Sequence, residues 1–204
     1  FCIFYFMPFG VLTVVFSLVP LQLLDKRLGI TISGVLRNWG LVFVCNFAGA
    51  MTTAFLMSFI LTYGYSIEGG AIAEKVASIG ESRTVGYQAH GFAGWITIFI
   101  RGMLCNWMVS MGVVGAMIST SAGAKMAAMW MPVMLFFFMG FEHSIVNMFL
   151  FPFSMIMGGE FTVYDYLVWN ELPTVLGNLA GGLLLVGLPL YYTHVRTSPA
   201  RKSA

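Results

Sequence analysis

Residues 140–149, which read GFEHSIVNMF, place a carboxyl group at Glu142 and an imidazole at His143 inside a long apolar segment. The whole segment, 126–156, is too long for one membrane-spanning helix, which needs about 20 mostly apolar residues. We therefore expect a helix that is broken next to Glu142. Non-helical backbone at membrane depth persists only where protein or water surrounds it, so the break is a candidate lining of a pathway.

The composition is typical of a membrane protein. Of the 204 residues, 59% are hydrophobic and 9% are charged, whereas soluble domains carry about 25% charged residues. This excludes a soluble globular domain, and the net charge of +2 is too small to indicate a nucleic-acid partner. The apolar runs predict an all-α, polytopic protein with one transmembrane domain over residues 1–204. Its helices are expected near 11–24, 38–62, 92–120, 126–156 and 173–193.

No pattern indicates an enzyme, a cofactor or a metal site. Cys2, Cys45 and Cys105 lie in apolar stretches and are interpreted as small core residues. The sequence contains no metal-ligand spacing, no nucleophile elbow and no phosphate-binding loop. We therefore expect no catalytic activity, no cofactor and no bound metal.

Basic residues predict how the spans cross the membrane. If the connection 25–37 is cytoplasmic and the spans alternate, residues 63–90 and 157–172 lie outside. The outside then holds two basic residues, Lys75 and Arg83, while Arg101 falls within a span. The inside holds seven, which are Lys26, Arg27, Arg37, Lys125, Arg196, Arg201 and Lys202. This excess of basic residues inside is the usual basis for orienting a membrane protein.

An internal repeat is visible at an offset of 132 residues. Three pairs of landmarks keep this spacing: Pro20 and Pro152, Asn38 and Asn170, and Asn46 and Asn178. Repeats that enter the membrane in opposite directions are common in transporters and channels. The second copy has a helix at 92–120 with no counterpart in the first copy. A first helix is therefore expected upstream of residue 1, which gives a three-plus-three, six-helix protein.

His143 and Glu142 are candidate pathway residues because ionisable groups at membrane depth are costly and usually functional. Histidine exchanges a proton near neutral pH, and the alternative for His143 is a packing histidine bonded between helices. The alternative for Glu142 is that it holds backbone donors at the break. Asn147 lies four residues after His143, on the same face if this turn is helical.

Other polar residues fall within the predicted spans. Asn46, Asn106 and Asn178 must bond to other helices, to exposed backbone or to a permeating ion, and structural bonding is favoured. Arg101 has three possible roles: to pair with Glu142, to cap a broken helix end, or to attract an anion from a cavity.

These motifs resemble the formate/nitrite transporter family. The resemblance is carried by residues 101–107 (RGMLCNW), 140–149 and 172–178 (LPTVLGN), with 37–39 (RNW) followed by 46–50 (NFAGA). The motifs keep the family's order and spacing and cover nearly the whole chain.

The resemblance implies an aquaporin-like six-helix protomer with broken second and fifth helices, assembled as a homo-pentamer with one pore in each protomer. The family's pore histidine falls on His143, its partner threonine on Thr13, and its pore asparagines on Asn106 and Asn178. Two departures stand out. The stretch around Thr13 lacks the family's acidic and small residues, and His90 stands near the position of a lysine that attracts the anion, so His90 or Arg101 is left to serve instead.

The function implied is transport of small monovalent weak-acid anions, formate or nitrite, across a lipid bilayer, which is expected to be the plasma (inner) membrane. Passage is expected to be proton-linked at His143, with Thr13, Glu142, Asn147, Asn106 and Asn178 along the pathway. Alternatives are another small solute in the same architecture, such as hydrosulfide or lactate, and a transport-inactive fragment.

Overall fold

A computed structural model describes residues 31–197, and all regular structure in that range is helical. The predicted helix at 11–24 and Thr13 lie outside the described residues. Three segments are long and apolar enough to cross a membrane: Ile32–Leu61, Gly91–Ile118 and Val163–His194. The main helices are α3 (Ile32–Leu61), α6 (Gly91–Ile118), α7 (Ala122–Phe138), α8 (Ser144–Ile156) and α10 (Leu172–Gly182).

Short elements complete the chain. Residues 63–90, expected as a loop, contain α4 (Gly70–Ser82) and α5 (Val85–Gln88). The last span is a continuous run that starts at residue 163 instead of near 173. It consists of α9 (Val163–Tyr166), η1 (Leu167–Glu171), α10, η2 (Leu183–Gly187), α11 (Leu188–Leu190) and η3 (Tyr191–Val195), where η denotes a π-helical turn.

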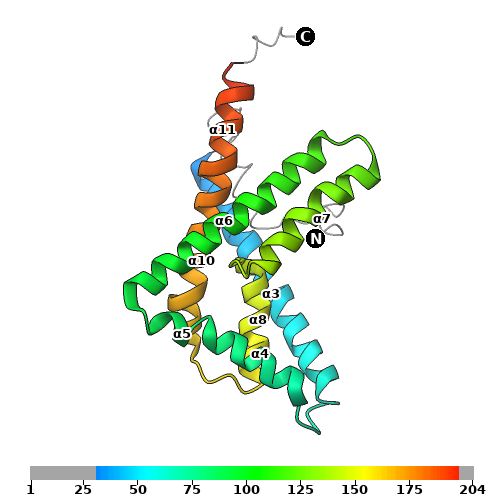
Figure 1. Ribbon diagram of the computed structural model, residues 1–204, viewed down its shortest axis with the longest axis vertical. Helices are drawn as coiled ribbons and strands as arrows, with labels where there is room; N and C mark the ends of the chain where they lie inside the picture. The colour runs from blue at the N-terminus through cyan, green and yellow to red at the C-terminus, as the bar shows by residue number, and fades with distance from the viewer. Residues whose placement is uncertain (1–30, 198–204) are drawn as a thin grey trace.

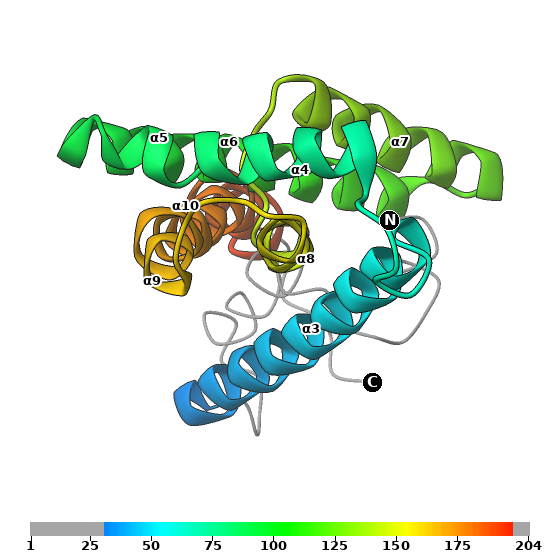
Figure 2. The ribbon, with the colours of Figure 1, turned by 90° about the horizontal axis from the view of Figure 1, so that it is seen from below.

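The helices form layers around α8 and α10. Seen along the long axis, α8 and α10 lie between α3 on one side and the row formed by α4, α5, α6 and α7 on the other (Figure 2). The short α4 and α5 lie at one end of the long axis, and α11 lies at the opposite end (Figure 1). The two connections predicted to be outside, before α6 and after α8, therefore meet at the same end.

Glycine residues allow α6 and α10 to pack backbone against backbone. A Cβ atom at Gly181 would lie 2.0 Å from the Met103 carbonyl oxygen, and one at Gly177 would lie 2.2 Å from that of Phe99. These distances are far below contact range, so only glycine fits at either position. The close crossing brings the polar side chains of α10 against the middle of α6.

The segment predicted as one broken helix forms the two helices α7 and α8. Ser121 begins α7 by accepting a bond from the Ala124 N–H, and the helix ends at Phe138. Gly140 follows with a left-handed φ of +63°, which glycine adopts without steric cost. Residues 139–143 are therefore non-helical, and α8 starts again at Ser144.

Apolar side chains of α3 pack on α8 around Met148, which contacts Trp39, Phe43 and Phe47. Most other apolar side chains of α3 face outward; Val44 and Ile60, for example, are both 65% exposed. Such a surface suits lipid or a neighbouring subunit and is unusual in water.

From the predicted orientation we expect one end of the molecule to be accessible to a reagent outside the cell. Cysteines placed at Ser78 on α4 and at Lys125 on α7, in a variant without the native cysteines, should differ in labelling by a membrane-impermeant maleimide in intact cells. Position 78 is expected to react, and position 125 only after the cells are opened. Labelling of position 125 but not 78 in intact cells would reverse the predicted orientation.

Candidate functional site

His143 occupies the N-cap of α8, at the end of the break. Its Nδ1 accepts a hydrogen bond from the Val146 N–H at 3.4 Å, which assigns the proton of the neutral ring to Nε2. The residue is 3% exposed, and its ring stacks on Phe136 of α7 with centroids 5.5 Å apart. The imidazole is thus held by α7 and α8 at the point where the backbone returns to helical geometry.

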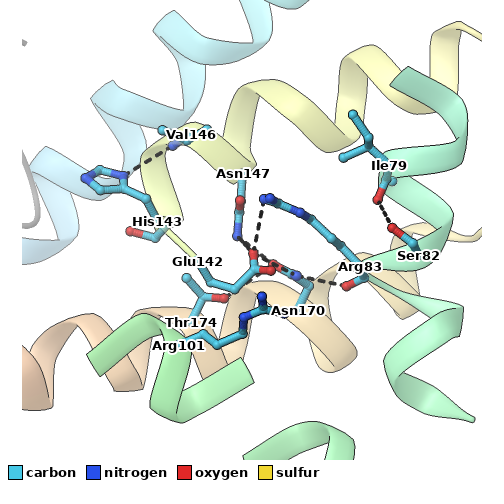
Figure 3. A network of polar contacts seen from close by, with 12 residues as sticks. Ile79, Ser82, Arg83, Arg101, Glu142, His143, Val146, Asn147, Asn170 and Thr174 are labelled. Carbon is cyan, nitrogen blue, oxygen red and sulfur yellow. Dashed lines mark hydrogen bonds and ion pairs between the residues drawn. The ribbon is translucent and has the colours of Figure 1, made fainter. Parts of the chain in front are cut away.

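Glu142, fully buried, is the centre of a polar network that ties the break to α8, η1 and the turn before α5 (Figure 3). Its Oε2 accepts bonds from Asn147 Nδ2 at 3.0 Å and Asn170 Nδ2 at 3.3 Å. Arg83 Nη1 lies 3.7 Å from the same oxygen. The Glu142 carboxylate therefore bonds to side-chain donors and faces a cation. Among the described residues, it accepts no bond from a backbone N–H at the break.

Asn170 extends this network. Its Oδ1 accepts from Asn147 Nδ2 at 2.7 Å and from Thr174 Oγ1 at 3.3 Å, and its Nδ2 also donates to the Arg83 carbonyl at 2.9 Å. Asn170 is fully buried. A buried side-chain amide needs hydrogen-bond partners, and both the oxygen and the nitrogen of the Asn170 amide have them.

Asn178 fastens the break to α6. Its Oδ1 accepts from the Ser144 N–H at 3.0 Å, and its Nδ2 donates to the carbonyls of Gly102 at 2.9 Å and Glu142 at 3.0 Å. Asn106 Nδ2 in turn donates to the Asn178 carbonyl at 2.6 Å. Both asparagines are fully buried. They bond to backbone groups at the crossing, as expected for structural amides.

Two guanidinium groups converge on the break. Arg101 Nη2 donates to the Met139 carbonyl at 3.4 Å, so it caps the end of α7, and Nη1 donates to the Tyr87 hydroxyl. A Cβ atom at Gly140 would lie 3.6 Å from Arg101 Nη2 and 3.8 Å from Arg83 Nη2. With Glu142 as their neighbouring anion, the pair leaves an excess of positive charge at this side of the break.

The structure brings five of the six predicted site residues together at the break: Glu142, His143, Asn147, Asn106 and Asn178; Thr13 lies outside the described residues. His143 and Asn147 do not act on one group, because the imidazole points to Val146 while the Asn147 amide points to Glu142 (Figure 3).

Sequence reasoning missed Arg83, Asn170 and Thr174 as members of the site. Asn170 had a signal, because it matches Asn38 in the internal repeat. Arg83 had none, because it lies in a segment expected to be a loop. His90 is exposed at the start of α6 and makes no side-chain cap there. Within residues 31–197, no group of three His, Cys, Asp or Glu side chains is placed to hold a metal ion.

Comparison with known proteins points in one direction. The family described as formate/nitrite transporter matches residues 1–192. A probable formate transporter of Methanothermobacter thermautotrophicus is 32% identical over 182 residues, which are 87% of this chain and 65% of that protein. The formate channel FocA of Haemophilus influenzae is 28% identical over 78% of this chain and 59% of its own length. The chain thus spans less than two thirds of the length of these relatives.

Solved structures show the same fold. An FNT family ion channel superposes with a TM-score of 0.74 and 26% identity, covering 93% of this chain and 69% of that one. A pentameric formate channel with formate bound gives a TM-score of 0.66 at 24% identity, over 80% of this chain and 68% of that one. The second likeness concerns the fold alone.

Proposed function

The chain belongs to the formate/nitrite transporter family, and from this premise we propose that it carries small monovalent anions of weak acids, formate or nitrite, across a lipid bilayer. The observation that carries the proposal is the break between α7 and α8, where a buried imidazole caps α8 and two guanidinium groups lie near Gly140. Formate is supported further by the relatives that are described as formate transporters or channels.

A bare anion pays a large desolvation cost in an apolar passage, and protonation to the neutral acid removes most of it. His143 is suited to lower this cost, either by donating a proton or by offering a positive charge. It lies at the N-terminus of α8, where the helix dipole also favours negative charge. We assign to the Thr13 hydroxyl and the backbone N–H groups of the break the role of holding the anion.

The remaining residues have supporting roles. Arg83 and Arg101 would draw the anion towards the break by their field, a role that the family resemblance gave to a lysine. Glu142 and Asn147 would keep the break in shape. Asn106 and Asn178 would satisfy the backbone groups that the break exposes.

The assembly proposed is a homo-pentamer in the plasma (inner) membrane, with one pore in each protomer. It is supported by the structural neighbour that is described as pentameric, and by the wide apolar surface that a single protomer exposes on α3 and α7.

Uptake by proteoliposomes tests the function. Vesicles that contain the protein should take up labelled formate or nitrite faster than protein-free vesicles, and uptake should rise as the outer pH falls. Native mass spectrometry of the same preparation should give the mass of five chains. Faster uptake of hydrosulfide or lactate would reassign the substrate, and no difference from protein-free vesicles would mean that the chain is inactive.

A further inference from the structure

Glu171, at the end of η1, is a buried carboxyl group that the transport scheme above does not use. It is 3% exposed, and its Oε2 accepts a hydrogen bond from the Tyr166 hydroxyl at 3.0 Å. Its Oε1 is also buried and has no hydrogen-bond partner among the residues that the structure describes. A buried carboxylate with an unsatisfied oxygen is costly, so this group calls for a functional explanation.

The charged and titratable groups around Glu171 come from several elements. The elements packed against η1 are α5, α6, α8, α9 and α10, and the break and the turn before α5 lie beside them. Asp165 is engaged by the backbone N–H and hydroxyl of Thr162, and Tyr87 is bonded to Arg101. Helices α8 and α10 carry no titratable side chain. The full set is Tyr164, Asp165 and Tyr166 on α9, Tyr87 on α5, His90, Arg101 and Cys105 at the start of or on α6, Arg83 in the turn, and Glu142 and His143 at the break.

Glu171 lies next to the network around Glu142, because its neighbour Asn170 bonds to Glu142 Oε2 at 3.3 Å and to the Arg83 carbonyl at 2.9 Å. Among the described residues of this region, the ion pair joins Arg83 to Glu142. Glu142 also leaves one oxygen without a partner, but its other oxygen receives two amide donors and the guanidinium. Glu171 has one hydroxyl donor. Burial with few hydrogen-bond donors penalises the charged form of a carboxyl group.

We propose that Glu171 is a proton-binding site linked to anion binding at the break. The inference rests on the proposed function. With Glu171 protonated, Arg83 and Arg101 against Glu142 leave one positive charge around the break; with Glu171 ionised, that charge is cancelled. An anion therefore binds better when Glu171 carries a proton, and by linkage the anion strengthens proton binding by the same factor.

The consequence is a pH dependence of anion binding on the side of the membrane that holds α4, α5 and α9. Removing one nearby charge changes the dissociation constant of the anion by roughly tenfold where the charges are partly screened. The effect falls on the apparent KM for the anion and leaves the maximum flux unchanged, because the chemistry at His143 is not involved. This distinguishes Glu171 from a residue that acts on the passage step.

The test varies the pH on that side of oriented proteoliposomes while the other side is held constant. The apparent KM of the parent for formate should rise by roughly tenfold from acidic to alkaline pH. In Glu171→Gln it should stay near the low value of the parent at acidic pH. Tyr166→Phe, which removes the hydroxyl donor, should move the rise to higher pH. Glu160→Gln, an exposed carboxyl on the same side, is the matched control and should behave as the parent. An unchanged KM profile in Glu171→Gln would overturn the proposal.

Infrared difference spectroscopy gives a readout that does not depend on formate transport. Acidification of the parent should add a carbonyl band of a buried carboxylic acid, and this band should be missing in Glu171→Gln and kept in Glu160→Gln. If the band persists in Glu171→Gln, the proposal is wrong even where formate is transported. If the parent moves neither formate nor nitrite, the proposed function fails, and the infrared titration alone decides whether Glu171 binds the proton.

Discussion

Replacing His143 with asparagine is expected to lower formate flux by about a hundredfold at acidic pH and to flatten its pH profile, while the protein stays folded. Asparagine is a good N-cap residue, so its side chain can replace the bond that His143 Nδ1 accepts from the Val146 N–H. It cannot carry a proton near neutral pH. The substitution therefore removes the proton and keeps the cap.

His143→Phe is the companion variant, because it tests the capping role and the proton-carrying role of His143 together. Phenylalanine loses the cap as well as the proton, which should cost about 1 kcal/mol of stability in addition to the flux. Formate flux against pH and thermal unfolding of both variants are the measurements. If His143→Asn keeps the flux and the pH profile of the parent, His143 is a packing residue and the mechanism is wrong.

Replacing Asn178 with alanine is expected to have the largest effect on stability. The change leaves the Ser144 N–H and the carbonyls of Gly102 and Glu142 without their bonds in a buried site. Each buried group left unsatisfied costs about 1–3 kcal/mol, so a loss of roughly 3–5 kcal/mol is expected. The break would lose its attachment to α6, and flux should fall with it.

The matched control is Asn38→Ala, because Asn38 is an exposed asparagine on α3. Its stability should stay within about 0.5 kcal/mol of the parent. Thermal unfolding in detergent and formate uptake measure both variants. Equal unfolding temperatures for Asn178→Ala and Asn38→Ala would mean that Asn178 does not fasten the break.

The break and most of its residues were predictable from the sequence because a carboxyl and an imidazole stood in an apolar segment too long for one span. The helix bounds were less predictable. Runs without charges mark the part of a helix that lies in lipid, whereas α3 starts at Ile32 with Thr31 as its N-cap and includes Arg37. A long basic side chain near a helix end can reach the membrane surface, so it does not end the helix.

The partner of Glu142 could not be predicted. The sequence offered Arg101, which lies within a span, but Arg101 caps α7 and Arg83 approaches Glu142. This contact depends on how the turn between α4 and α5 folds back over η1, where Asn170 bonds to the Arg83 carbonyl. Contacts of this kind depend on tertiary packing, and the spacing of residues in the sequence does not encode them.

The central claim, that formate crosses with a proton, is tested most directly by the charge and the protons moved with each formate. Formate uptake, membrane current and internal pH would be recorded together in proteoliposomes, with protein-free vesicles and His143→Asn as controls. We expect one proton to enter with each formate and no net current. One negative charge per formate, without acidification of the interior, would contradict proton-linked passage at His143.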